Sequence, residues 1–169
     1  MTNKENKMPQ TWKAACKFLT QSISQHNNKV LKRSYRIFYG SKVPDISISN
    51  YVIRIYKYAR CSEACIVVAL IYIERLLKKN LEMTLDELSV HRLFLSAIIL
   101  AIKFYDDEYY NNKFYAKMGG VACHDLNKLE RKFIRYLDYD LTVKSELFEQ
   151  YSKDLIERET INASHDNVQ

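Results

Sequence analysis

The residues of this chain that could do chemistry are not spaced as a catalytic site. The densest group of carboxylates consists of Asp106, Asp107 and Glu108, which are consecutive in the sequence. General acid–base catalysis needs two carboxyl groups held on either side of a substrate, and three neighbours on one segment do not provide that arrangement. We expect this acidic segment to be either a protein-binding site or a solvated loop.

The other residues with catalytic or metal-binding potential give no better support for an enzyme. The four histidines lie far apart, and there is no glycine-rich phosphate loop, no G-x-S-x-G and no H-E-x-x-H. Cys61 and Cys65 are close in sequence, but no second pair of Cys or His follows at the spacing of a zinc site. We therefore expect a protein that is not an enzyme, that binds no metal or other cofactor and whose cysteines are free thiols.

Two apolar runs, at residues 64–77 and 93–102, are too short to be membrane spans, which need about 20 apolar residues. The first ten residues are polar and lack the apolar centre of a secretory signal. These features predict a nuclear or cytoplasmic protein with no membrane partner, in which both runs form buried helices.

The net charge of +6 is concentrated near the N-terminus. Residues 1–44 contain nine Lys or Arg and one Glu, whereas residues 45–169 have a net charge of −2. The most basic stretch is at residues 29–42. Such a segment can contact nucleic acid, anionic lipid or an acidic protein face, and it can also be a solvated surface.

The elements that must position these residues are expected to be helices. Only three glycines and two prolines interrupt the chain, and an all-β fold would need many more turn residues. Apolar residues recur at helical spacing instead. We expect helices at residues 10–26, 47–59, 63–79, 86–104, 112–118, 125–138 and 145–157. They predict a single all-α domain in which the third helix is central and the others wrap around it.

Charged residues on these apolar helices need partners, because burying an unpaired charge is costly. Arg54 and Glu74 lie on consecutive helices, and we expect a structural ion pair between them. Lys103 and Glu130 lie at exposed ends of two helices. Each could be an ordinary surface charge or part of a partner-binding site.

Several short motifs together resemble the cyclin box. They are PDISISNYVIR at residues 44–54, LIYIER at 70–75, VHRL at 90–93 and AIKF at 101–104. The stretch YAKMGGVACHDLNKLE at residues 115–130 is similar to P/U-type cyclins, the family of the fungal phosphate-pathway cyclin. The Y-A-K-x-G-G and L-N-x-L-E pieces occur in the family's order and at its spacing.

The resemblance implies a five-helix cyclin box over residues 44–143. A helix and a basic connector would precede it at residues 1–43. A further helix would follow at residues 144–158, and we expect a flexible tail at residues 159–169.

Cyclins bind and activate cyclin-dependent serine/threonine kinases, so the resemblance implies a heterodimer with such a kinase and substrates recruited through the complex. In the family, the exposed ends of two box helices press on the kinase's regulatory helix. They move its glutamate towards the lysine of the ATP site, an ion pair that an active kinase requires. The lysine and glutamate that the family uses match Lys103 and Glu130.

Further positions of the family's kinase-binding surface can be matched one by one. Its apolar contacts correspond to Phe104, Ile134, Tyr139 and Leu141. Asp107 corresponds to an acid of this cyclin subfamily, which could pair with a kinase arginine near the activation segment.

The chain departs from the family pattern at two places. The family's internal Arg–Asp pair becomes Arg54 and Glu74, which are one methylene longer. The substrate-docking patch of cell-cycle cyclins corresponds to Ile53, Lys57 and Arg60. Two positions that are apolar in those cyclins are therefore cations here, at Lys57 and Arg60. We expect apolar R-x-L substrate peptides to dock poorly here and acidic segments to be favoured.

A second interpretation is a cyclin-fold adaptor that binds nucleic acid or transcription machinery through the basic N-terminal segment. Proteins that read DNA sequence usually show a recognisable reading element, and this chain has none. Nucleic acid is therefore the less favoured partner.

Overall fold

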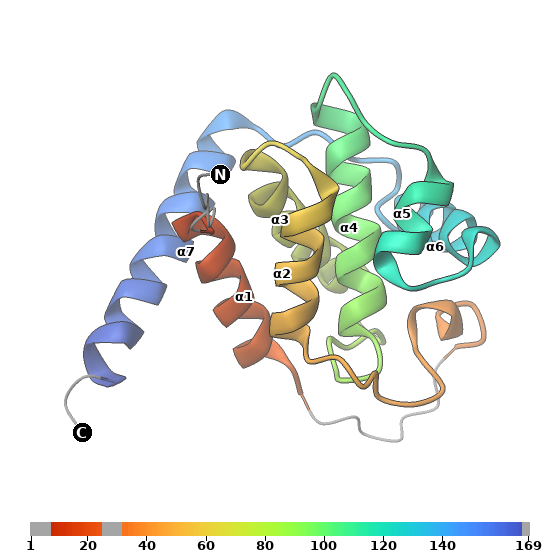
Figure 1. The fold of residues 1–169 in the computed structure, drawn as a ribbon, viewed down its shortest axis with the longest axis horizontal. Helices are drawn as coiled ribbons and strands as arrows, with labels where there is room; N and C mark the ends of the chain where they lie inside the picture. The colour runs from red at the N-terminus through yellow and green to blue at the C-terminus, as the bar shows by residue number, and fades with distance from the viewer. Residues whose placement is uncertain (1–7, 25–31, 167–169) are drawn as a thin grey trace, which may run out of the picture.

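The computed structural model describes residues 8–24 and 32–166, and these parts of the chain are helical (Figure 1). The elements are α1 (Gln10–Ser22), the 3-10 helix η1 (Arg36–Phe38), α2 (Ile48–Ala59), α3 (Ala64–Lys79), α4 (Val90–Tyr105), α5 (Asn112–Gly119), α6 (Cys123–Tyr136) and α7 (Ser145–Asp166). The described residues form no strand beyond an isolated bridge between Ser24 and Asp86. The predicted all-α fold is confirmed.

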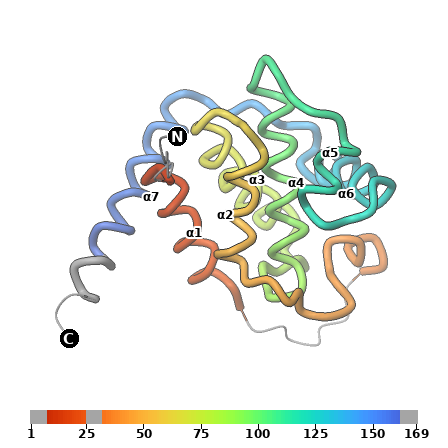
Figure 2. The backbone as a smooth tube through the Cα atoms, viewed as in Figure 1, coloured from red at the N-terminus to blue at the C-terminus, as the bar shows by residue number. Residues whose placement is uncertain are grey.

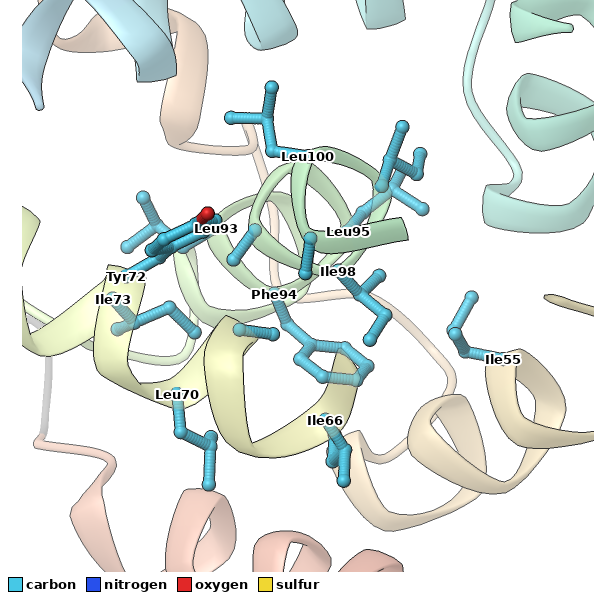
Figure 3. Packing of buried hydrophobic residues seen from close by; sticks show 14 of the residues in the cluster. Ile55, Ile66, Leu70, Tyr72, Ile73, Leu93, Phe94, Leu95, Ile98 and Leu100 are labelled. Atoms are coloured by element: carbon cyan, nitrogen blue, oxygen red, sulfur yellow. The ribbon is translucent and has the colours of Figure 1, made fainter. Parts of the chain in front are cut away.

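The centre of the domain is the pair α3 and α4. Almost every side chain of α4 is buried, and Phe94 reaches from α4 towards α3 near Ile66 (Figure 3). This burial explains why both helices are apolar nearly all round, as the sequence predicts. No helix in the described parts of the chain is long and apolar enough to cross a membrane.

Helix α4 begins four residues later than the expected Asp86. The Asp86 carboxylate accepts hydrogen bonds from the backbone N–H groups of Leu88 (2.9 Å) and Ser89 (3.1 Å). An aspartate that binds the backbone two and three residues ahead stabilises a turn instead of a helix. The helix therefore starts only after this turn, at Val90.

Helix α1 is part of the same hydrophobic core as the box. Trp12 is 1% exposed, and its ring lies 5.2 Å from that of Tyr56 on α2. The helix ends at Ser22 and not at the expected His26, which lies outside the described residues. Just beyond it, the backbone N–H of Ser24 donates to the carbonyl of Leu85 at 3.1 Å, so the chain turns away from the helix axis.

The described part of the basic connector, residues 32–42, packs on the box beside α6 (orange in Figure 2). The backbone N–H of Gly40 donates to the carbonyl of Leu88 at 2.8 Å, and Arg92 donates to the carbonyl of Ile37 at 2.8 Å. Phe38 is fully buried. The connector is thus held by the domain itself, while residues 29–31 lie outside the described part.

Helix α7 packs against α1 and α3 and continues to Asp166. The expected end of this helix near residue 158 therefore lies inside it, and most of the expected tail at 159–169 is helical. The Tyr151 hydroxyl donates to the Glu74 carboxylate at 2.8 Å, which fixes α7 on α3. This hydrogen bond gives the Glu74 carboxylate a partner where α7 packs on α3.

The imidazole of His91 is buried at the start of α4. Its Nε2 hydrogen-bonds the carbonyl of Ile46 at 2.8 Å, and its buried Nδ1 has no partner among the described residues. The His91 and Tyr51 rings meet edge to face, with 5.0 Å between the ring centroids. Burial lowers the pKa of His91 below its ordinary value of 6.5, against the smaller opposing effect of the Ile46 hydrogen bond.

This burial predicts a pH-dependent stability. As the pH falls below about 6.5, the unfolded chain takes up a proton at His91 that the folded protein resists, so the free energy of unfolding decreases. The contribution is at most about 1.4 kcal/mol per pH unit. In His91→Gln, whose amide can still donate to Ile46, urea unfolding between about pH 7 and pH 5.5 should show a weaker pH dependence than the wild type. An equal dependence in both proteins would contradict this assignment.

Candidate functional site

The two opposite charges predicted for partner binding, Lys103 at the end of α4 and Glu130 on α6, lie side by side. Lys103 Nζ is 2.7 Å from Glu130 Oε1. Asn112, at the start of α5, joins them: its Oδ1 accepts from Lys103 Nζ at 2.6 Å and its Nδ2 donates to Glu130 Oε2 at 2.7 Å. Three helices therefore meet at one polar cluster.

This cluster is accessible at one edge. The side chains of Lys103 and Glu130 are 25% and 18% exposed, respectively. Because Asn112 restrains both groups, the positive and negative ends keep a fixed order on the surface. An incoming protein with complementary charges meets groups that are already oriented, which lowers the entropy cost of binding.

Large exposed aromatic side chains occur near the C-terminal ends of α4 and α6. Phe104, the residue after Lys103, is 50% exposed, and Tyr139, three residues after α6, is 69% exposed. Ile134 is half-buried on α6, and Leu141 is buried at 8% exposure. Leu141 therefore offers little area to a partner. Exposed aromatic residues beside charged groups are typical of protein–protein hot spots.

Tyr139 is directed outwards by the way α6 ends. Asp138 and Tyr139 both have positive φ angles, 56° and 60°. The backbone N–H of Tyr139 donates to the carbonyl of Ile134 at 3.0 Å, the bond of a Schellman-type helix end. Left-handed backbone is unfavourable for an aromatic residue, so the surrounding contacts must hold it.

Those contacts come from α3 and α4. Arg75 donates to the carbonyls of Asp140 at 2.6 Å and Thr142 at 3.2 Å. The hydroxyls of Tyr72 and Tyr105 both donate to the carbonyl of Leu141, at 2.6 and 3.2 Å. The segment after α6 is consequently fixed to the two central helices.

The carboxylates of the acidic loop after α4 have two different roles. The Asp106 carboxylate accepts from the backbone N–H of Ser62 at 3.0 Å, so it joins the loop to the start of α3. Helix α3 has no side-chain cap at its start, and the Ser62 hydroxyl lies 3.3 Å from Cys65 Sγ. Asp107 is exposed. Only Asp107 and Glu108 therefore present charge to a partner.

The expected ion pair between Arg54 and Glu74 does not form. Arg54 Nη2 donates to the carbonyl of Lys117 at 3.4 Å, whereas Glu74 accepts from Tyr151 and lies 3.6 Å from Lys78 Nζ. The physical reason is the helix register. Arg54 lies off the buried stripe of α2 on the side that faces α5, and Glu74 faces α7.

The three positions of the altered docking patch do not share one surface. Ile53 and Lys57 line a groove of about 690 Å³ between α2 and α5. Its other lining residues are Asn50, Arg54, Tyr58, Phe114, Lys117 and Met118. Arg60 instead ends α2 in left-handed backbone (φ 49°) and donates to the Tyr110 hydroxyl at 3.4 Å, beside Asp107. The groove is lined by both apolar side chains and cations.

Two residues of the candidate site could not be found by sequence reasoning. Asn112 follows Asn111, whose side chain accepts from the backbone N–H of Phe114 at 3.0 Å and caps α5. A pair of asparagines at a helix start indicates a cap, and nothing in the sequence shows that the second binds two charges. Tyr105 is one of many tyrosines, and its link to residues 141 and 143 depends on the fold.

No group of three or more potential metal ligands comes together in the described residues. The cysteines are free: Cys65 is buried, Cys16 and Cys61 are half-buried and Cys123 is exposed. The observed geometry is that of a binding surface, with an ion pair, exposed aromatics and a groove.

Comparison with known proteins identifies relatives over most of the chain. Residues 4–141 match the family model described as Cyclin. The chain is 45% identical to Cyclin-U1-1 of Arabidopsis thaliana over 119 residues, which is 70% of this chain and 57% of that protein. It is 41% identical to Cyclin-P3-1 of Oryza sativa subsp. japonica over 149 residues, 85% of this chain and 62% of that protein. The chain thus spans less than two thirds of the length of these two relatives.

Proposed function

Since this chain belongs to the cyclin family, in its P/U-type branch, we propose that it binds and activates a cyclin-dependent serine/threonine kinase. The observation that carries the proposal is the cluster of Lys103, Glu130 and Asn112, together with the exposed Phe104 at the end of α4 and the exposed Tyr139 after the end of α6. We call these five residues the kinase-binding face. The resemblance inferred from the motifs alone is confirmed by the family match.

Each part of the kinase-binding face has a role in this proposal. Phe104 and Tyr139 would supply the apolar area that holds the kinase's regulatory helix. Lys103 and Glu130 would set the orientation of that helix, because exchanging the charges would place like charges together. The helix would then be held where its glutamate reaches the ATP-site lysine. Asp107 would meet a kinase arginine.

The chain itself would perform no chemistry. It would act by stabilising one conformation of the kinase. The gain in kinase activity would then depend on how much more tightly the chain binds the active conformation than the inactive one. The test is to mix the purified chain with cyclin-dependent kinases and to measure complex formation and phosphate transfer to a peptide. Binding with a gain of activity supports the proposal, and absence of binding to any such kinase contradicts it.

The groove between α2 and α5 is proposed to receive part of a recruited substrate. Ile53 and Phe114 are 38% and 37% exposed, so their apolar surface is accessible. The cations Arg54, Lys57 and Lys117 line the same groove. This combination favours a peptide whose apolar side chains alternate with carboxylates, and it disfavours the arginine of an R-x-L peptide.

Fluorescence anisotropy with the isolated protein can test this preference. A labelled peptide in which leucines alternate with glutamates should bind more tightly than an R-x-L peptide. Lys57→Glu should weaken binding of the acidic peptide about tenfold, because it reverses a charge at the groove. Lys13→Glu, on the exposed side of α1, is the matched control and should have little effect. Micromolar binding of an R-x-L peptide that Lys57→Glu leaves unchanged would contradict the proposal.

A further inference from the structure

Helix α6 carries a second charged surface, separate from Lys103 and Glu130. Lys128, Arg131 and Arg135 are exposed and lie three or four residues apart, on the side of the helix opposite its buried residues Leu126, Leu129 and Phe133, and the half-buried Lys132 lies next to them. Residues at this spacing share one helix face. We call these four residues the basic stripe. In the described part of the chain, no carboxylate lies within ion-pair distance of any of them.

The basic connector extends this surface, although it lies about a hundred residues away in sequence. Tyr136, at the end of α6, donates from its hydroxyl to the carbonyl of Ser34 at 3.2 Å, and its ring lies 5.0 Å from that of Tyr35. The neighbouring Arg33 and Arg36 are exposed. Lys132 Nζ lies 6.0 Å from the centre of the Tyr136 ring, so this tyrosine connects the two basic segments.

Carboxylates border this surface on several sides. Asp125 lies in the first turn of α6, and Asp138 follows its end, 3.0 Å from Lys79 Nζ. On the connector side, Lys32 pairs with Glu82 at 2.8 Å. A long polyanion would run from the basic stripe onto these acids and be repelled. A short acidic segment would not extend that far.

The length of the basic stripe also fits a short segment. With a rise of about 1.5 Å per residue, Lys128 and Lys132 are separated by about 6 Å along the helix and Lys132 and Arg135 by about 4.5 Å. In an extended peptide, side chains on one face recur every ~6.6 Å. Two or three acidic side chains on alternate residues can therefore meet successive cations.

We propose that the basic stripe, together with Arg33 and Arg36, docks a short acidic segment of a protein partner. The basic stripe lies on a different side of α6 from Glu130, although Arg135 and Tyr139 line the same depression at the end of the helix. The docking would rely on charge and would weaken as salt screens it.

The test uses the full chain without kinase, so its outcome does not depend on the kinase-binding face. The probe is a fluorescein-labelled ten-residue peptide of alternating glutamate and serine. A triple variant should bind this peptide at least about tenfold more weakly than the wild type. Its substitutions are Lys128→Glu, Lys132→Glu and Arg135→Glu. The matched control changes the net charge equally at exposed lysines elsewhere, through Lys13→Glu, Lys113→Glu and Lys144→Glu. It should stay within about twofold of the wild type, and circular dichroism should show both variants folded.

Three results would overturn the proposal. An equal loss of affinity in the matched control would mean that only the net charge matters. A loss caused by Lys57→Glu would place the peptide in the groove between α2 and α5. Tighter binding of a single- or double-stranded oligonucleotide of the same charge, lost in the basic-stripe variant, would assign the surface to nucleic acid.

Discussion

Exchanging the charges of the central ion pair, through Lys103→Glu together with Glu130→Lys, is expected to abolish kinase binding while the chain stays folded. The exchange keeps one positive and one negative side chain at two positions whose charged groups lie 2.7 Å apart in the unmodified chain, so an attraction between them is retained. Asn112 can serve the exchanged pair as well, because its amide offers both a donor and an acceptor. Only the order of the charges on the surface is reversed.

For a partner, that reversal is severe. Each charged group of the kinase that faces this cluster would meet a like charge in a partly buried contact, which costs about 2–5 kcal/mol. The affinity should therefore fall by at least about 100-fold. Isothermal titration calorimetry with the purified kinase measures the loss, and urea unfolding should show a change in stability below about 1 kcal/mol.

The chain offers a matched control on α7. Lys153 and Glu157 form an exposed pair at 3.8 Å, and exchanging them reverses an ion pair without touching the kinase-binding face. This control should bind the kinase normally. If the Lys103/Glu130 exchange also bound normally, those residues would have only a structural role and the kinase-binding face would be wrongly placed.

The sequence predicts the helices well because each has a strong apolar pattern. The extents of α3 and α5 agree with expectation within one residue, since cations or glycines mark their ends. The start of α4 is missed because the Asp86 turn competes with the helix. The end of α7 is missed because a polar helix surface resembles a polar tail.

The candidate site is only partly predictable, because spatial neighbours are not encoded by local pattern. The motifs identify Lys103 and Glu130 separately, but their contact depends on how α4 crosses α6. The Arg54–Glu74 pairing fails because consecutive helices need not direct their charges at each other. The connector is joined to α6 through Tyr136, and no periodicity in the sequence predicts that these two segments meet.

Removing the indole of Trp12 is expected to destabilise the whole domain. Trp12→Ala should lower the free energy of unfolding by about 3–5 kcal/mol, as for other large aromatic residues replaced in a core. Trp12 is 1% exposed and α1 packs on α2, α3 and α7, so few neighbours can move into the space left behind. For a chain of this size, each 1 kcal/mol lowers Tm by about 2–4 °C, which predicts a decrease of about 6–20 °C by differential scanning calorimetry.

A conservative variant tests how much of the stability depends on having an aromatic ring at position 12. Trp12→Phe keeps an aromatic ring next to Tyr56 and should recover more than half of the lost stability. A decrease in Tm below about 3 °C for Trp12→Ala would mean that α1 packs loosely and that the box is stable without it. The expected large decrease would instead mean that the domain extends beyond residues 44–143. The helix before the box would then belong to the unit that must fold before any kinase can bind.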